Sequence, residues 1–203
     1  GDLRPALPRL AESQRQVRLQ AQAWLTQALV ECERRGEAPP LLTHFFMAQA
    51  ALGLGDPPAA RAALVRAGAR GEVEAWRIEL AGALAALLAG ELRTALELAY
   101  RARELSPGEE RSLVVYAMAL VLDRAGAPEA AARQLAALGG SRFGNERVGI
   151  DMMLPFPERL YLSALEEQAR RNPGNARLLW ESYLACPEPE EPDLTPAEQG
   201  AHR

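Results

Sequence analysis

Lysine is missing from this sequence: all 23 basic residues are arginine, set against 27 Asp and Glu, and the formal net charge is −4. Alanine, glycine and proline are abundant, so we attribute the absence of lysine to codon usage in a GC-rich bacterial genome. Non-specific nucleic-acid binding needs clustered basic residues that create a positive field. The acidic balance therefore argues against a nucleic-acid partner.

Aromatic residues are also scarce, at 5% of the chain, whereas hydrophobic residues reach 48%. Alanine and leucine dominate the apolar set and are strong helix formers, whereas strands favour β-branched and aromatic residues. A chain of 203 residues suits one domain or one short repeat array. The composition thus predicts an all-α protein with a substantial buried core.

Cysteines and long apolar stretches are few. Cys32 and Cys186 lie far apart and match no CxxC or metal-ligand spacing, so we expect reduced thiols and no metal. No apolar run reaches the roughly 18 residues of a transmembrane helix, and no signal peptide is visible. We expect a cytoplasmic protein without membrane insertion. Because the chain begins at Gly1 rather than Met, a periplasmic protein whose upstream signal was removed stays open.

Catalytic residue sets are lacking as well. The chain has only two histidines, His44 and His202, and no GxSxG, HExxH, P-loop or GxGxxG motif. His44 precedes two phenylalanines on an expected helix, which favours a partly buried structural role. We therefore expect no enzymatic activity, no catalytic residue and no cofactor.

What the sequence does contain is an internal repeat. Gly55, Gly90 and Gly126 are spaced by 35 and then 36 residues, and the alanines five positions later keep that spacing, at Ala60, Ala95 and Ala131. A glycine can end a helix in the left-handed conformation, and a small residue lets the next helix lie close against the first. One helical hairpin cannot bury its apolar face alone, so we expect successive hairpins to stack.

The central repeat carries the fullest pattern: a small residue late in its first helix, a glycine before the second, two alanines within it and a final proline, at Ala83, Gly90, Ala95, Ala102 and Pro107. This pattern and a period of about 34 residues resemble the tetratricopeptide repeat family. The resemblance covers residues 40–140 and departs at Glu79 and Gly82, where the family has Trp and Leu. It implies a right-handed superhelical stack of antiparallel helix hairpins, an α-solenoid. An ordinary helical bundle with accidental glycine spacing is the alternative.

We expect one helical domain over residues 1–185. It comprises an N-terminal capping helix at 9–35, hairpin repeats at 41–69, 72–105 and 108–138, an irregular loop at 141–156 and a C-terminal hairpin at 157–185. The capping helix shows an apolar face with helical spacing, formed by Leu10, Val17, Ala21, Trp24 and Ala28. Residues 186–203 are acidic and proline-rich, which predicts a disordered tail.

In the tetratricopeptide family, the first helices of successive repeats line a concave groove. By this resemblance, the partner-binding residues are Leu42, Phe45, Gln49, Arg77, Leu80, Leu84, Leu113, Tyr116 and Leu120, flanked by Leu52, Leu87 and Asp123. The positions of the carboxylate clamp found in some members hold Phe45, Gln49, Ala81, Leu113 and Ala117, so that clamp is absent. An apolar groove favours an amphipathic helix or an apolar peptide. Alternatively, the chain's own C-terminal helices fill the groove.

Two other features allow more than one interpretation. Met152, Met153 and Phe156 lie in an apolar run that either plugs an open end of the core or forms a secondary partner contact. Arg15 and Arg18 decorate the first helix, where a solvated face is favoured over contact with an acidic partner.

The leading hypothesis is therefore a non-catalytic bacterial scaffold or adaptor that binds a protein or peptide partner. The alternatives are an interaction module of a larger signalling, motility or secretion protein and, with weaker support, a small all-α enzyme. Pairing of two copies into a homodimer stays open.

Overall fold

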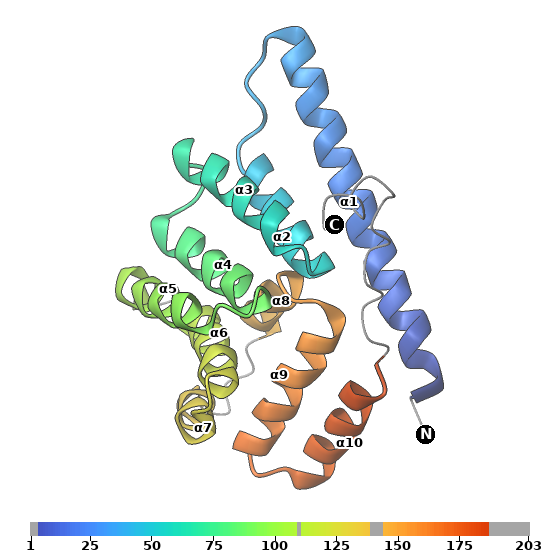
Figure 1. Cartoon of the computed structure of the whole chain (residues 1–203), viewed down its shortest axis with the longest axis vertical. Coiled ribbons are helices and arrows are strands. Elements are labelled where there is room, and N and C mark those ends of the chain that lie inside the picture. The colour runs from blue at the N-terminus through green and yellow to red at the C-terminus, as the bar shows by residue number, and fades with distance from the viewer. Residues whose placement is uncertain (1–3, 109–110, 139–143, 187–203) are drawn as a thin grey trace, which may run out of the picture.

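A computed structural model of the chain describes residues 4–108, 111–138 and 144–186 (Figure 1). These residues form a 3-10 helix, η1 (Arg4–Ala6), and ten α-helices, and they contain no strand. The helices are α1 (Leu7–Arg35), α2 (Thr43–Leu54), α3 (Pro57–Ala69), α4 (Ala75–Leu88), α5 (Leu92–Leu105), α6 (Arg111–Arg124), α7 (Pro128–Ala137), α8 (Gly144–Met152), α9 (Phe156–Ala169) and α10 (Pro173–Leu184). The all-α prediction is confirmed.

From α1 to α7, helices adjacent in sequence pack against each other in space, and so do α9 and α10. The most extensive contacts join α2 to α3, α4 to α5, α6 to α7 and α9 to α10, so each of these pairs is a hairpin. Helix α4 also contacts both α2 and α6, which links the hairpins to one another. The first three hairpins lie within the ranges expected for the repeats, 41–69, 72–105 and 108–138.

The repeated glycines end the first helix of each hairpin. Gly55, Gly90 and Gly126 have φ angles of 75°, 75° and 83°, the left-handed conformation that the sequence predicts. The next residue donates its N–H to a carbonyl five positions back, as Asp56 does to Ala51 at 2.9 Å. Buried alanines follow on the second helix, at Ala60, Ala95 and Ala131. Each repeat thus has a glycine-ended first helix and a second helix that packs closely through a buried alanine.

The core follows α4 and α6, whose side chains are buried on nearly all sides. Ile150 of α8, Met153 and Leu154 of the turn after it, and Leu162 of α9 join this core. The apolar run at 152–156 is therefore divided: Met153 and Leu154 plug the core, whereas Met152 is exposed and Phe156 is partly buried.

One prediction of secondary structure is wrong. Residues 144–152 of the expected irregular loop form α8. Gly149 lies within this helix because α8 packs against α6: a Cβ atom at Gly149 would lie 3.2 Å from Leu113 Cδ2. Close packing selects glycine here, although glycine weakens an isolated helix. The predicted tail from residue 187 onward and the segment 139–143 lie outside the described residues.

Candidate functional site

The structure buries most of the residues predicted to line a concave groove. Leu80 and Leu84 of α4 and Leu113, Tyr116 and Leu120 of α6 all belong to the core. The chain's own C-terminal helices lie against α6, since Tyr116 donates its hydroxyl to Glu166 Oε1 of α9 at 3.1 Å. In this conformation these five side chains are buried and present almost no surface to a partner.

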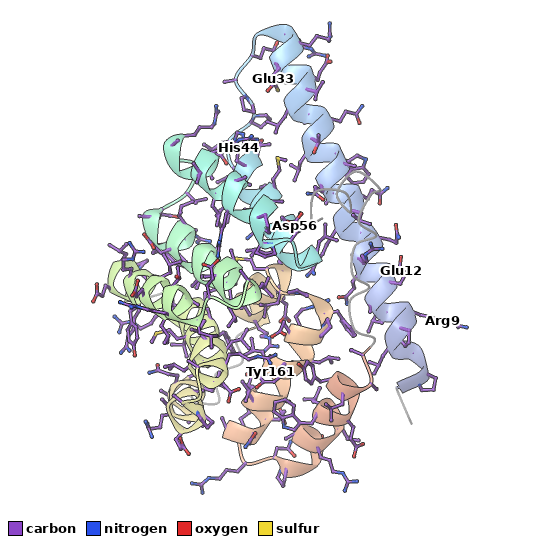
Figure 2. All side chains as sticks on the ribbon, viewed as in Figure 1. Arg9, Glu12, Glu33, His44, Asp56 and Tyr161 are labelled. Carbon is purple, nitrogen blue, oxygen red and sulfur yellow. The ribbon has the colours of Figure 1, made fainter. Side chains whose placement is uncertain are left out.

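Further contacts hold the C-terminal hairpin in this position. Tyr161 lies on the side of α9 that faces α6, where its hydroxyl donates to Asp123 (Figure 2). The guanidinium of Arg124 lies 3.8 Å from the centre of the Tyr161 ring. Burial, the hydrogen bond to Asp123 and the charge of Asp123 raise the pKa of Tyr161. The part of the expected groove that α6 would form is thus occupied by the protein's own C-terminal hairpin.

The other predicted groove residues border a shallow pocket. Leu42, Phe45, Gln49 and Arg77 line a depression of about 600 Å³ together with Glu72 and its neighbours. Phe45 itself is buried, whereas Leu42, Gln49 and Arg77 are partly exposed. This pocket mixes polar and apolar groups and adjoins a larger groove through Phe46 and Gln49, which line both.

The larger groove lies between α1 and the body of the molecule. Helix α1 runs along one side of the protein and returns to α2 through residues 36–42 (Figure 1). The space beside it has a volume of about 920 Å³ and is lined by Ser13, Gln14, Val17, Arg18, Ala21, Trp24, Leu25, Ala28, Phe46, Gln49, Ala50, Val148, Asp151, Met152 and Arg159. Four helices, α1, α2, α8 and α9, thus contribute to one groove.

Large apolar side chains remain exposed on both walls of this groove. On α1, Val17 is 63% exposed and Trp24 is 64% exposed. On the opposite wall, Phe46, Val148 and Met152 are exposed. Leu7 is the one buried residue among the described positions of α1, so this long helix rests on the body without burying its apolar face.

Arg18 fastens the middle of α1 to the body. Its guanidinium donates to the carbonyl oxygen of Gly53 at the end of α2, and to that of Asp151 at the end of α8 at 3.0 Å. Burial and the nearby charge of Arg159 lower the pKa of Arg18 to about 10. The prediction of a solvated face is wrong for Arg18. The side chain of Arg15 is exposed, as expected.

Several polar atoms at the groove lack a hydrogen-bond partner within the described chain. They are Gln14 Oε1, Gln49 Oε1, and both Nε and Nη2 of Arg159, and all of them are buried. Asp151, by contrast, accepts from Arg147 Nε at 3.0 Å. Burial raises the pKa of Asp151 even so, because it outweighs the attraction of Arg147.

His44 belongs to a different, internal network. Its Nδ1 donates to Glu72 Oε1 at 2.6 Å, and the N–H of Phe45 donates to Glu72 Oε2 at 3.0 Å. His44 stands at the start of α2 (Figure 2), and the pair ties this start to the turn before α4. No cluster of three or more metal-ligating side chains occurs in the described parts of the chain.

Sequence reasoning missed the residues of the far wall: Phe46, Val148, Asp151 and Arg159. One sequence pattern did indicate the wall formed by α1. Leu10, Val17 and Trp24 recur every seven residues, and large apolar residues at this spacing favour packing against another element. Such a face predicts that the capping helix packs through it, whereas the structure leaves Leu10, Val17 and Trp24 exposed.

Comparisons with known proteins give no match, either to a family model or to curated proteins or solved structures. Among the described residues, none of the helices combines the length and the apolar character that crossing a bilayer requires.

Proposed function

We propose that this protein is a non-catalytic bacterial scaffold or adaptor that holds an amphipathic helix or apolar peptide of a protein partner between α1 and the body. The observation that carries the proposal is the open groove whose two walls expose Val17, Trp24, Phe46, Val148 and Met152. The proposal keeps the kind of partner that the sequence predicts and moves its site to the groove lined by α1, α2, α8 and α9.

The groove has the dimensions that a bound helix needs. The lining residues of α1 run from Ser13 to Ala28, about 22 Å at roughly 1.5 Å per residue. A helix laid beside α1 would meet the apolar residues at Val17 and Trp24 one heptad apart, as in helix-in-groove recognition. Contiguous exposed apolar surface is uncommon on monomeric proteins and marks interaction sites.

The scaffold itself supports a tetratricopeptide-like interpretation. Three consecutive hairpins share left-handed glycines at the same place and buried alanines five residues later. We propose that these hairpins stack with a right-handed superhelical progression, and that α1 and the C-terminal hairpin close the two ends. Such arrays act as binding surfaces because each repeat adds a rigid element to the same framework.

A matched pair of substitutions tests the groove. Val17 on the groove and Val65 on α3 are both highly exposed valines on helices, and only Val17 lines the groove. Helix-forming peptides of about 16 residues, the length of α1 along the groove, are selected from a phage library on the full chain. Their affinity is then measured by fluorescence anisotropy for the unmodified protein, Val17→Asp and Val65→Asp.

We expect Val17→Asp to weaken binding by about tenfold or more, because a charge replaces an apolar contact, and Val65→Asp to leave it unchanged. Circular dichroism verifies that both variants remain folded. A selection that yields no binder, or binders that Val17→Asp does not weaken, would reject the groove as the binding site.

A further inference from the structure

The groove carries an unbalanced positive charge. Its ionisable lining residues are Arg18, Asp151 and Arg159, two cations and one anion. Asp151 already pairs with Arg147, and Arg18 already donates to two backbone carbonyls. Arg159 alone among the three keeps donors, Nε and Nη2, that are buried and unpartnered within the described chain.

The two free donors of Arg159 have a geometry that one ligand group matches. Nε–H and the N–H of Nη2 point from the same edge of the planar guanidinium. A carboxylate accepts both in parallel, which gives the bidentate pair that arginine forms with Asp and Glu. The protein covers both donors in this conformation, so the Arg159 guanidinium must turn toward the groove to meet a carboxylate. Burying such donors without an acceptor costs free energy, so an occupant that supplies a carboxylate gains more than one that is wholly apolar.

We infer that the helix held in the groove presents an Asp or Glu carboxylate to Arg159 from within its apolar face. The inference rests on the proposed function and specifies its partner: leucine-like side chains against Val17, Trp24 and Met152, interrupted by one acid. The free acceptors Gln14 Oε1 and Gln49 Oε1 further favour an occupant that also brings a hydrogen-bond donor, such as an amide or hydroxyl side chain.

Charge complementarity selects this occupant over the other candidates. A second copy of the chain that offered α1 would bring mainly arginine near its apolar face, at Arg15 and Arg18, and so would add to the positive charge. A small ligand usually has most of its surface enclosed. Here Val17 and Trp24 remain about two-thirds exposed along some 22 Å of α1, which suits a helix better.

The test is a double-mutant cycle on the peptides selected as above. Each binder that contains an acid is synthesised with Glu and with Gln at that position. Both forms are titrated against the unmodified protein and against Arg159→Gln, Arg159→Lys and the control Arg15→Gln. Arg15 is a suitable control because its side chain is exposed and it is not among the groove residues.

We expect the Glu form to bind about tenfold more tightly than the Gln form on the unmodified protein and on Arg15→Gln. On Arg159→Gln this preference should disappear, and Arg159→Lys should keep part of it, because lysine retains the charge without the planar fork. The lysine variant keeps the test usable if Arg159→Gln does not fold.

Other outcomes overturn the inference and separate it from the proposed function. If peptides need Val17 but show the same Glu preference on every Arg159 variant, the groove remains the binding site and the pairing of the acid with Arg159 is rejected. An absence of Val17-dependent peptides would remove both. A concentration-dependent mass that Val17→Asp abolishes would place a second copy in the groove instead. Tighter binding of a fatty acid such as laurate, lost in Arg159→Gln, would replace the helix by a lipid.

Discussion

Glu72 is a carboxylate buried at the turn between α3 and α4. It accepts hydrogen bonds from His44 and from the N–H of Phe45, and Arg70 Nε lies 3.2 Å from its Oε1. Burial opposes ionisation of Glu72, but the hydrogen bonds from His44 and Phe45 and the charge of His44 outweigh it and lower the pKa of Glu72. One charged side chain thus connects the first hairpin to the second.

The lowered pKa of Glu72 gives a pH dependence with a definite sign. Because the folded pKa lies below the unfolded value of about 4.3, the contribution of Glu72 to stability is present above that pH. It is lost as the pH falls through the folded pKa. Glu72→Gln should therefore lower the free energy of unfolding by about 2 kcal/mol at neutral pH and flatten its decline below about pH 4.3.

Urea unfolding between neutral and acidic pH measures this effect. Glu74→Gln is the matched control. Glu74 lies two residues away and its exposed side chain forms an ion pair with Arg77, so this substitution should change stability little. If both variants showed the same pH profile as the unmodified protein, the Glu72 network would carry no linkage to folding.

The residue scale also shows where sequence reasoning succeeds. The left-handed glycines and the buried alanines follow from spacing alone, because backbone conformation and helix contact depend on the local residue type. Leu42 and Arg171 adopt positive φ angles of 70° and 60° with no such signal. The His44–Glu72 pair was equally hidden: a structural role was predicted for His44, but its partner lies 28 residues away and depends on how α2 meets the following turn.

At the scale of elements, α8 depends on one close approach. A Cβ atom at Gly149 would lie 3.2 Å from Leu113 Cδ2, tighter than ordinary van der Waals contact. Gly82 in the middle of α4 differs, since its Cβ atom would meet Leu98 Cδ1 at 3.5 Å, an ordinary distance. Two helical glycines therefore face leucines with different amounts of room.

This difference predicts opposite effects on stability. Gly149→Val should lower the free energy of unfolding by about 2 kcal/mol, because two further methyl groups crowd a buried leucine. Gly82→Ala should raise it by about 1 kcal/mol through helix propensity. Thermal and urea unfolding measure both. Equal stability of Gly149→Val and the unmodified protein would contradict the packing of α8 on α6.

The same packing explains why α8 escaped prediction. Gly144, Gly149 and Pro155 are residues that weaken or end helices, and together they predicted a loop. In the structure Pro155 lies just beyond α8 and caps α9, while Gly149 is needed for contact with Leu113. Tertiary packing overrides local propensity here, and no sequence pattern within residues 141–156 reports on Leu113.

At the scale of the molecule, the groove could not be located from sequence for a related reason. Its walls come from α1, α2, α8 and α9, with lining residues from Ser13 to Arg159. A repeat pattern describes only contacts between neighbouring hairpins. The apolar face of α1 was visible as a heptad of large residues. The position of α1 on the body involves hydrogen bonds from Arg18 to two distant carbonyls, those of Gly53 and Asp151, which no repeat pattern reports.

This arrangement leaves α1 with far less buried surface than α4 and α6. Leu7 is its one buried residue in the described chain, whereas α6 buries most of its length. Hydrogen exchange reports local opening, whose free energy falls where few apolar contacts hold an element. We therefore expect the amides of α1 to exchange much faster than those of α4 and α6 in the unmodified protein.

We expect the two hydrogen bonds of Arg18 to the Gly53 and Asp151 carbonyls to limit local opening of α1. Arg18→Met keeps the apolar stem and removes the guanidinium, so it should cost about 2 kcal/mol of local stability and speed exchange in α1 more than tenfold, with α6 unchanged. Arg15→Met, on the exposed side of the same helix, should leave exchange as it is. Slow exchange throughout α1, or an effect of Arg18→Met on α6 instead, would contradict the expectation that α1 opens locally and is held to the body by Arg18. A bound helix contacts both walls, so it should slow exchange in α1 and replace part of the attachment that Arg18 provides.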